Sequence, residues 1–193
     1  MSDTRVQNEA SQSELEKRRR EAQRDIRVIG DPVLRERAAE VTSFDRGLRK
    51  LVKRMVRTMR DAPGIGLAAP QVGVLQRLLV YDLEDESRVL VNPVLTDFAD
   101  EVEELDEGCL SVPGLTMPIS RAVRVRIVAV DAYGEPLTFV AEGIEARVIQ
   151  HEYDHLEGVL IVDRTSPSAR AAALREMAER RGAGELHAVG GGL

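Results

Sequence analysis

The segment that most restricts how this chain can fold is residues 144–159. The side chains that recur there at helical spacing are Ile144, Val148, His151, His155 and Val159. This spacing predicts a helix over about residues 144–156, which Gly158 is placed to end. Apolar residues flank the two histidines, so the helix has to lie inside the molecule. Because burying ionisable side chains is costly unless they are paired or bind a metal, the histidines need a partner.

His151 and His155 are four residues apart, so on a helix their imidazoles lie on the same face. Glu152 follows the first histidine and completes the pattern H-E-x-x-H, in which two histidines bind a metal and the glutamate is a general base. The alternative is a polar helix face with two surface histidines. The apolar flanks favour the metal site over this alternative.

A catalytic metal site of this kind has three protein ligands and one open position, and the sequence offers two sources for the third ligand. Downstream, Glu176 and Glu179 lie at a suitable distance, but their charged segment is typical of a solvated helix face. Upstream is Cys109, the one cysteine of the chain. A lone cysteine is usually a small buried apolar residue. Gly108 and Pro113 constrain its surroundings, however, as expected for a loop that carries functional residues.

The overall composition excludes several classes of protein. The chain has 193 residues, which suits one globular domain, and 43% of them are hydrophobic, enough for a core. Its net charge of −6 does not indicate nucleic-acid binding, and no apolar run is long enough to span a membrane. The polar N-terminus lacks the apolar region of a secretory signal, and a single cysteine excludes an internal disulfide framework. We expect a cytoplasmic protein.

The chain divides into three parts. Residues 1–24 are polar and are expected to form a poorly ordered or helical tail outside the core. Residues 25–166 form a single domain. Residues 167–193 form a C-terminal helix, over about residues 168–181, and a flexible glycine-rich tail. Within the domain, apolar residues at helical spacing predict an amphipathic helix over residues 45–60, with Ser43 as its N-cap.

Strands fill the middle of the domain. The runs RLLVYD and RVLVNPVL are typical of strands, and Val123, Val125 and Ile127 alternate with arginines. After the turn AYGEP, the run LTFVA is the returning strand. The expected fold class is α+β, with small mixed or antiparallel β-sheets around a central metal-binding α-helix, an N-terminal amphipathic helix and a C-terminal helix.

Three blocks of the sequence together resemble peptide deformylase of the bacterial type. They are GIGLAAPQ at residues 64–71, EGCLS at residues 107–111 and HEYDHLEG at residues 151–158. They occur in the order of that family and at similar spacings, and the resemblance covers about residues 25–163. It implies that residues 25–166 are a catalytic metallohydrolase domain. This domain would remove the N-terminal formyl group from formyl-methionine of newly made polypeptides and release formate.

The resemblance also implies a role for each residue of the site. The implied metal ligands are Cys109, His151 and His155. The metal is one divalent ion per chain, with Fe²⁺ expected in the cell and Zn²⁺, Ni²⁺ or Co²⁺ able to take its place. A metal-activated water attacks the formyl carbon, while Glu152 takes its proton and returns it to the departing amine. The side-chain amide of Gln71 and the backbone N–H of Leu110 donate to the developing oxyanion.

The substrate is expected to bind between the glycine-rich block and the helix. The residues implied in substrate binding are Ile65, Gly66, Leu105, Gly108, Ile144 and Val148. Gly66 lets a peptide backbone approach closely, so that a nascent peptide can add as a strand beside Ile65. Apolar side chains form a pocket for the methionine. Glu107 and Asp154 are expected to orient the imidazoles of the ligands.

Two other functions stay open from the residues alone. One is a zinc endopeptidase built on the same H-E-x-x-H pattern, with a downstream glutamate as third ligand. The other is a non-catalytic module that binds a metal through Cys109, His151 and His155.

The expected partners are N-formylmethionyl peptides of nascent chains, with no membrane and no specific nucleic acid. Docking of the C-terminal helix to the ribosome is a further hypothesis. Residues 168–187 carry four arginines against three glutamates, and such a mixed segment attracts RNA phosphate weakly.

Overall fold

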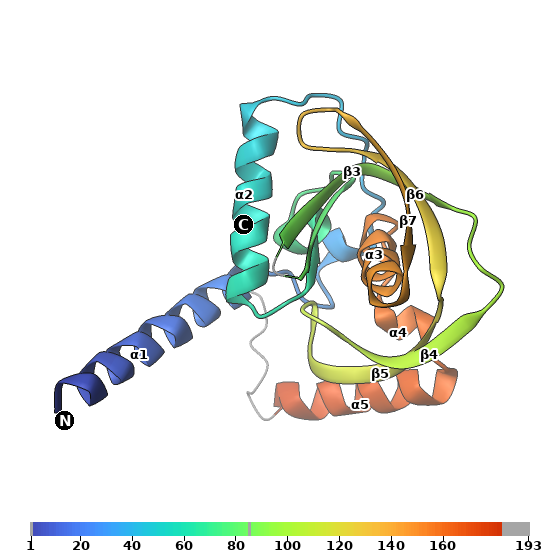
Figure 1. Ribbon diagram of the computed structural model, residues 1–193. Helices are drawn as coiled ribbons and strands as arrows, with labels where there is room; N and C mark the ends of the chain where they lie inside the picture. Colours follow the sequence, from blue (N-terminus) through green and yellow to red (C-terminus); the bar gives the residue numbers. More distant parts are fainter. Residues whose placement is uncertain (1, 85, 183–193) are drawn as a thin grey trace.

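The computed structural model describes residues 2–84 and 86–182, which form an α+β fold (Figure 1). The helices are α1 (Ser2–Asp25), α2 (Arg46–Asp61), α3 (Gly143–Leu156), α4 (Ile161–Arg164) and α5 (Pro167–Gly182), with the short 3-10 helices η1 (Pro32–Arg35) and η2 (Ala69–Val72). The strands are β1 (Gly66–Ala68), β2 (Leu78–Leu83), β3 (Glu86–Thr96), β4 (Val102–Cys109), β5 (Val112–Ala122), β6 (Arg124–Val130) and β7 (Pro136–Glu142). The fold class predicted from the sequence is confirmed.

The strands form two sheets among the described residues. One has five strands in the order β1-β2-β3-β6-β7, and the other is the hairpin of β4 and β5. The neighbouring strands in both are antiparallel. The β3–β6 register shifts between Val91 and Val94, around Pro93, which has no N–H to donate. The side chain of Asn92 bonds to both backbone groups of Val41 there, which positions the chain that leads into α2.

Helix α3 is the centre of the molecule and lies between the two sheets (Figure 1). It packs against β1, β2 and β7 of the larger sheet and against β5 of the hairpin. Ala146, Ile149 and Leu156 are fully buried. Gly158, with φ of 72°, adopts the left-handed conformation just after the helix. The prediction of a buried central helix that ends at this glycine is therefore confirmed.

Helix α2 is amphipathic and covers the β1–β2 end of the larger sheet. Its buried residues are Leu48, Val52, Met55, Thr58 and Met59. The predicted N-cap was wrong by two residues. The cap is Asp45, whose carboxylate accepts a hydrogen bond from the backbone N–H of Leu48 at 3.0 Å, so Ser43 lies outside the helix. The carboxylate satisfies an N–H that the first turn leaves unpaired.

Helix α1 projects away from the domain, and its C-terminal turns contact α2 (Figure 1). Ala22 and, just after the helix, Ile26 are buried, and Arg18 forms an ion pair with Asp61 at 2.7 Å. Of the two states expected for the polar N-terminus, the described residues adopt the helical one. The expectation that this segment lies outside the core was wrong at its last turn, where Ala22 packs in the core cluster that contains α2. Among them, no helix combines the length and the apolar character that crossing a membrane requires.

The β4–β5 hairpin and α4 were not predicted. Most of β4 is exposed on both faces, so its sequence lacks the alternation that indicates a strand. In β5, Leu115, Met117 and Ile119 alternate with exposed residues and are buried. Ala173 and Met177 of α5 share their core cluster. The C-terminal helix is therefore part of the folded domain, packed against the hairpin.

Candidate metal centre and substrate cavity

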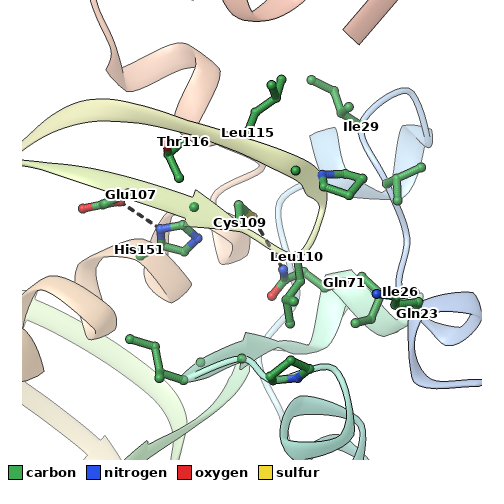
Figure 2. A pocket seen from close by; sticks show the side chains of 18 of the residues that line it. Gln23, Ile26, Ile29, Gln71, Glu107, Cys109, Leu110, Leu115, Thr116 and His151 are labelled. Atoms are coloured by element: carbon green, nitrogen blue, oxygen red, sulfur yellow. Dashed lines mark hydrogen bonds and ion pairs between the residues drawn. The ribbon is translucent and has the colours of Figure 1, made fainter. Parts of the chain in front are cut away.

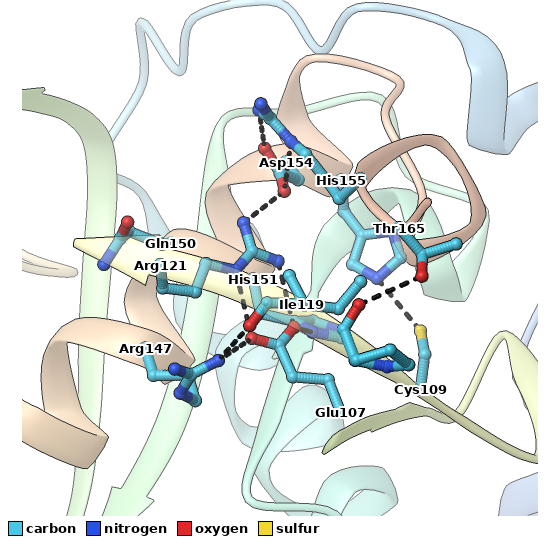
Figure 3. Close-up of polar contacts among 12 residues, drawn as sticks. Glu107, Cys109, Ile119, Arg121, Arg147, Gln150, His151, Asp154, His155 and Thr165 are labelled. Carbon is cyan, nitrogen blue, oxygen red and sulfur yellow. Dashed lines mark hydrogen bonds and ion pairs between the residues drawn. The ribbon is translucent and has the colours of Figure 1, made fainter. Parts of the chain in front are cut away.

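Three side chains with metal-binding atoms meet where α3 faces the end of β4 (Figure 3). The ligand atoms of Cys109, His151 and His155 all lie within 4.8 Å of one another. Sγ of Cys109 is 3.3 Å from Nε2 of His155, and the two imidazole rings are 5.4 Å apart between their centroids. The fold thus brings together two residues one helical turn apart and a third from another element.

Cys109 reaches this point where the β4–β5 ladder changes register. The pairing is regular up to Gly108 and shifts between Gly108 and Cys109, which pairs with Val112. A local irregularity of this kind redirects a side chain relative to the alternation of its strand. The turn that follows is fastened by the backbone N–H of Ile29, which donates to the carbonyl of Ser111 at 2.8 Å. Cys109 is left half-buried, facing α3.

Glu107 holds one of the two imidazoles. Its Oε2 lies 2.9 Å from Nδ1 of His151, which leaves Nε2 as the ring nitrogen available to a metal. The carboxylate of Glu107 also accepts hydrogen bonds from Arg121, at 3.0 Å on each oxygen, and from Arg147 at 2.8 Å. Burial raises the pKa of Glu107, but hydrogen bonds from His151 and Arg121 outweigh it and lower the pKa to about 2. An ionised carboxylate in this position orients the imidazole.

Asp154 was also expected to orient an imidazole, but it contacts Arg121 rather than a histidine. Its carboxylate is buried and accepts hydrogen bonds from Arg121, at 2.6 Å, and from Arg164. Arg121 in turn donates to Glu107, so a chain of charged groups runs from Asp154 to His151 (Figure 3). The contribution of Asp154 is therefore to hold Arg121 in place.

Glu152 lies next to the ligands and is buried, with 4% of its surface exposed. Burial raises its pKa to about 7, in the range suited to a general base at neutral pH. Its Oε2 and Nδ1 of His155 have no hydrogen-bond partner among the described residues. Unpaired buried polar atoms are rare in proteins, so their presence here indicates that a bound molecule completes the site. The free oxygen of Glu152 can accept a hydrogen bond from it.

Gly66 is required by the position of Glu152. A Cβ at residue 66 would lie 2.4 Å from Oε1 of Glu152, far inside van der Waals contact. The backbone of β1 therefore runs directly against this carboxylate. Since β1 is the terminal strand of its sheet, it presents one edge with backbone groups that an extended peptide can pair with.

Gln71 is held rigidly beside Cys109. Its Oε1 accepts a hydrogen bond from the backbone N–H of Ala68 at 2.7 Å, and its Nε2 donates to Oγ of Ser111 at 3.2 Å. The same Nε2 lies 3.8 Å from Sγ of Cys109, so an N–H donor is aimed at the ligand cluster. Leu110 follows Cys109 in the chain and lines the adjoining cavity.

A cavity of about 1330 Å³ opens next to these residues (Figure 2). Of the residues expected to bind substrate, those that line it are Ile65, Gly66, Gly108, Ile144 and Val148. Ile65 and Ile144 are 56% and 55% exposed, so apolar surface is available there to a ligand. Leu105 does not line the cavity. It lies on β4 with 43% of its surface exposed, and its contact with the methionine side chain stays a prediction.

The donor set fits a divalent metal ion. One thiolate and two imidazoles form a ligand set that zinc and other divalent transition metals accept. Three protein ligands leave one coordination position for water or substrate, which is typical of catalytic sites. Glu152 next to such an ion can move a proton, and Gln71 can donate to an oxygen that gains charge. The arrangement is suited to hydrolysis of a carbonyl compound that enters through the cavity.

Several residues around this centre were not assigned to it from the sequence. Arg121 continues the inward alternation of Met117 and Ile119 in β5, so its spacing could have shown that it is buried. Arg147 donates to Glu107 and to two backbone carbonyls, and its position in a buried helix was the available signal. Gln23 and two arginines of α1 line the cavity, and no pattern in that polar segment indicated this.

The chain matches a family model described as polypeptide deformylase over residues 23–171. The peptide deformylase of Acidothermus cellulolyticus is 49% identical over 164 residues, covering 85% of this chain and 91% of that protein. The crystal structure of peptide deformylase from Thermotoga maritima is similar with a TM-score of 0.72 at 48% identity, covering 74% of this chain and 97% of that chain. A peptide deformylase structure from Legionella pneumophila is similar with a TM-score of 0.78 at 40% identity, covering 84% of this chain and 98% of that chain.

Proposed function

The chain belongs to the peptide deformylase family of enzymes that remove formyl groups, and from this we propose how its own residues act on formyl-methionine of newly made polypeptides. Hydrolysis of the formyl amide would release formate and leave a free N-terminal methionine. One observation carries the proposal. The ligand atoms of Cys109, His151 and His155 lie within 4.8 Å of one another, with the buried Glu152 beside them at the cavity.

Cys109, His151 and His155 are the residues that would hold one divalent ion. When bound, such an ion supplies Lewis acidity, which stabilises negative charge on oxygen and makes water more acidic. Glu107 supports this role by holding His151 through Nδ1. We propose Fe²⁺ as the ion in the cell, and the same donor set accepts Zn²⁺, Ni²⁺ or Co²⁺. A thiolate beside ferrous iron is sensitive to oxidation, so the enzyme should be handled without oxygen.

Glu152 is the residue that moves the proton. It would remove a proton from the attacking water and then donate it to the departing amine nitrogen of the methionine. Its pKa of about 7, raised by burial, suits both directions of transfer at neutral pH. Because β1 passes against it with no space for a side chain at Gly66, the carboxylate is held close to the backbone edge where the peptide would bind.

Gln71 and Leu110 would stabilise the charge that develops on the formyl oxygen. Oε1 of Gln71 is anchored by the backbone N–H of Ala68, so the Nε2 donor is oriented before substrate arrives. The second donor is the backbone N–H of Leu110, next to Cys109 in the chain. Each such donor is typically worth about 2.7–4 kcal/mol of barrier.

The substrate would bind as an added strand along the edge of β1, beside Ile65 and Gly66. Gly108 also lines the cavity. The methionine side chain would pack against Ile144 and Val148 of α3, which provide apolar surface near the ligands. Pairing through backbone groups is independent of side chains, so the enzyme can accept many sequences after the methionine.

Two alternatives are less well supported. For an endopeptidase, the third ligand would be Glu176 or Glu179, but both are exposed on α5 and Glu176 pairs with Arg180 at 2.5 Å. A structural metal site usually has four protein ligands, whereas the cluster found among the described residues has three. The remaining histidine, His187, lies outside the described residues.

Formate release from formyl-methionyl-alanine tests the proposed function. Freshly purified, oxygen-free protein should release formate. The variant Glu152→Gln should lose activity by about 100-fold or more while it keeps its metal. Cys109→Ser should lose metal and activity, whereas the matched control Glu176→Ala should keep both. If the wild-type ferrous enzyme produced no formate, the proposed function would be wrong.

Docking of α5 to the ribosome stays a prediction. Arg170 lies 3.6 Å from Asp163 and Arg180 pairs with Glu176, so two of its arginines already have acidic neighbours. The helix also contributes buried core residues, so deleting it would disturb the fold. Reversing the exposed charge of Arg175 with Arg175→Glu is the cleaner test. Co-sedimentation with ribosomes equal to that of the wild type would count against docking through this helix.

A further inference from the structure

The cavity extends past the groups that would handle formyl-methionine, and we propose that its outer part binds acidic side chains of the substrate through Arg20 and Arg24 of α1. This inference rests on the proposed function, because it takes the ligand to be a peptide. It gives the N-terminal helix a role in selecting among nascent chains by the residues that follow the second position.

The size of the cavity indicates that it holds more than one residue of substrate. Its volume is about 1330 Å³, whereas pockets for small ligands usually occupy about 300–1,000 Å³. Glu152 and His151 line the end where the reaction would occur. The residues that α1 adds to the lining are Arg20, Gln23 and Arg24. In Figure 2, Gln23 and Ile26, which lies just after the end of α1, are across the cavity from His151.

The edge of β1 sets the direction in which a bound peptide leaves the centre. The reacting end of the peptide has to lie near Gly66, which packs directly against Glu152. The two residues of β1 that follow Gly66 are fully buried, so the peptide cannot continue that way. On the other side, Ile65 is 56% exposed and Pro63 is also exposed. The peptide would therefore run past Ile65 toward Pro63.

Helix α1 is held next to this exit. Arg18 pairs with Asp61 at 2.7 Å, and Asp61 is two residues before Pro63. Ala22 and Ile26 are buried at 6% and 2% exposure in the core cluster that contains α2. These contacts fix the last turns of the helix, so the side chains that α1 adds to the cavity have a defined position.

The charges on this wall are available to a ligand. Arg20 and Arg24 are four residues apart, which places them on one face of the helix. Both are exposed, and neither forms an ion pair with the side chains that the structure describes. Like charges at this spacing repel each other, so a carboxylate between them is favoured. Arg180 also lines the cavity, but it is already bound to Glu176 and to the carbonyl of Gly114.

An extended peptide advances about 3.3 Å per residue, so the side chains beyond the second position are the ones that lie progressively further from the centre, and the test places the charges at the fourth and fifth positions. The experiment compares formyl-Met-Ala-Ala-Glu-Glu-Ala with the same peptide carrying two lysines in place of the glutamates. The measured quantity is the ratio of their kcat/KM values at low ionic strength, for the full-length metal-loaded enzyme. We expect the acidic peptide to be favoured about 5-fold, an effect typical of two exposed ion pairs, and the preference to fade in high salt.

The decisive variant is Arg20→Ala combined with Arg24→Ala, which should bring the ratio close to one. The matched control, Arg19→Ala combined with Arg46→Ala, removes the same charge from exposed arginines outside the cavity lining and should keep the 5-fold preference. A preference that survives in the first variant, or that disappears equally in the control, would overturn the proposal.

A second measurement separates this proposal from the proposed function. Binding of a fluorescent, unformylated Met-Ala-Ala-Glu-Glu-Ala peptide is followed by anisotropy, which needs no turnover. Weaker binding in the Arg20/Arg24 variant than in the control supports the site, and equal binding overturns it. Absence of formate from formyl-methionyl-alanine would instead contradict the proposed function, while the anisotropy result would still decide the role of α1.

Discussion

Oε2 of Glu107 lies 2.9 Å from Nδ1 of His151, and this contact ties a candidate metal ligand to a buried network of charged residues. The same carboxylate accepts hydrogen bonds from Arg121 and Arg147, and Arg121 also binds Asp154. The hairpin β4–β5 and the helix α3 are therefore connected through the group that orients an imidazole. Stability of the fold and geometry of the metal centre depend on the same side chains.

Replacing Glu107 by glutamine should weaken metal binding by about 10–100-fold, the effect typical of removing a partner of a ligand histidine. An amide is a weaker acceptor than a carboxylate, and its NH₂ group would face the arginines as a donor. Metal affinity is measured by competition with a chelator. The control is Glu104→Gln, an exposed glutamate of the same strand. Equal affinity in the Glu107 variant and the control would mean that Glu107 does not support His151.

Replacing Gly66 by alanine should reduce kcat/KM by about 100-fold, because the new Cβ would lie 2.4 Å from Oε1 of Glu152 and force the carboxylate to move. A misplacement of about 1 Å can cost a factor of this size. The matched control is Gly182→Ala, where nothing lies within 4 Å of the new atom. Wild-type kcat/KM for the Gly66 variant would show that the position of Glu152 is not critical.

Replacing Arg121 by methionine should lower the free energy of unfolding by about 3–5 kcal/mol, because Glu107 and Asp154 would remain buried with a partner missing. The free energy is measured by urea denaturation. The control is Arg126→Met, which removes an exposed ion pair with Asp97 and should cost at most about 1 kcal/mol. Similar losses in the two variants would mean that burial adds nothing to the importance of Arg121.

Asp163 should make stability depend on acidic pH. Burial raises its pKa, but hydrogen bonds from Arg35 and from the backbone N–H of Leu160 outweigh this and lower the pKa below its ordinary value. A carboxylate with a lowered pKa stabilises the fold above its unfolded pKa of about 3.9 and loses this effect as pH falls through the folded value. Asp163→Asn should therefore be less stable than wild type at neutral pH by about 0.2–1 kcal/mol.

The difference between wild type and Asp163→Asn should narrow as pH is lowered from about 5 toward about 2. Urea denaturation at several pH values measures it. Asp97→Asn, in an exposed ion pair with Arg126, provides the comparison. A difference that stays constant over this pH range would show that the ionised carboxylate of Asp163 does not contribute.

The elements that depend on local patterns could be predicted from the sequence. The central helix with His151 and His155 on one face, the amphipathic helix before the glycine-rich block and the strands with alternating residues all follow from spacing. Prediction failed where the pattern was weak. Most of the strand β4 is exposed on both faces, so it has no alternation. Asp45 rather than Ser43 caps α2, because both residue types are good N-caps and the sequence does not show which side chain reaches the first turn.

The sequence by itself determined the family, the fold class and the short-range pairing of the two histidines, because the residues concerned are close together in the chain or form family motifs. The tertiary structure decided which distant groups meet. The family motifs implied that Cys109 and Glu107 act with the histidines, but only the packing shows how. It brings the ligand atoms within 4.8 Å of one another, joins Glu107 to His151 through a buried charge network and places Arg20 and Arg24 at the cavity wall. Spacing along the chain cannot predict such contacts, because they depend on how separate elements pack against one another.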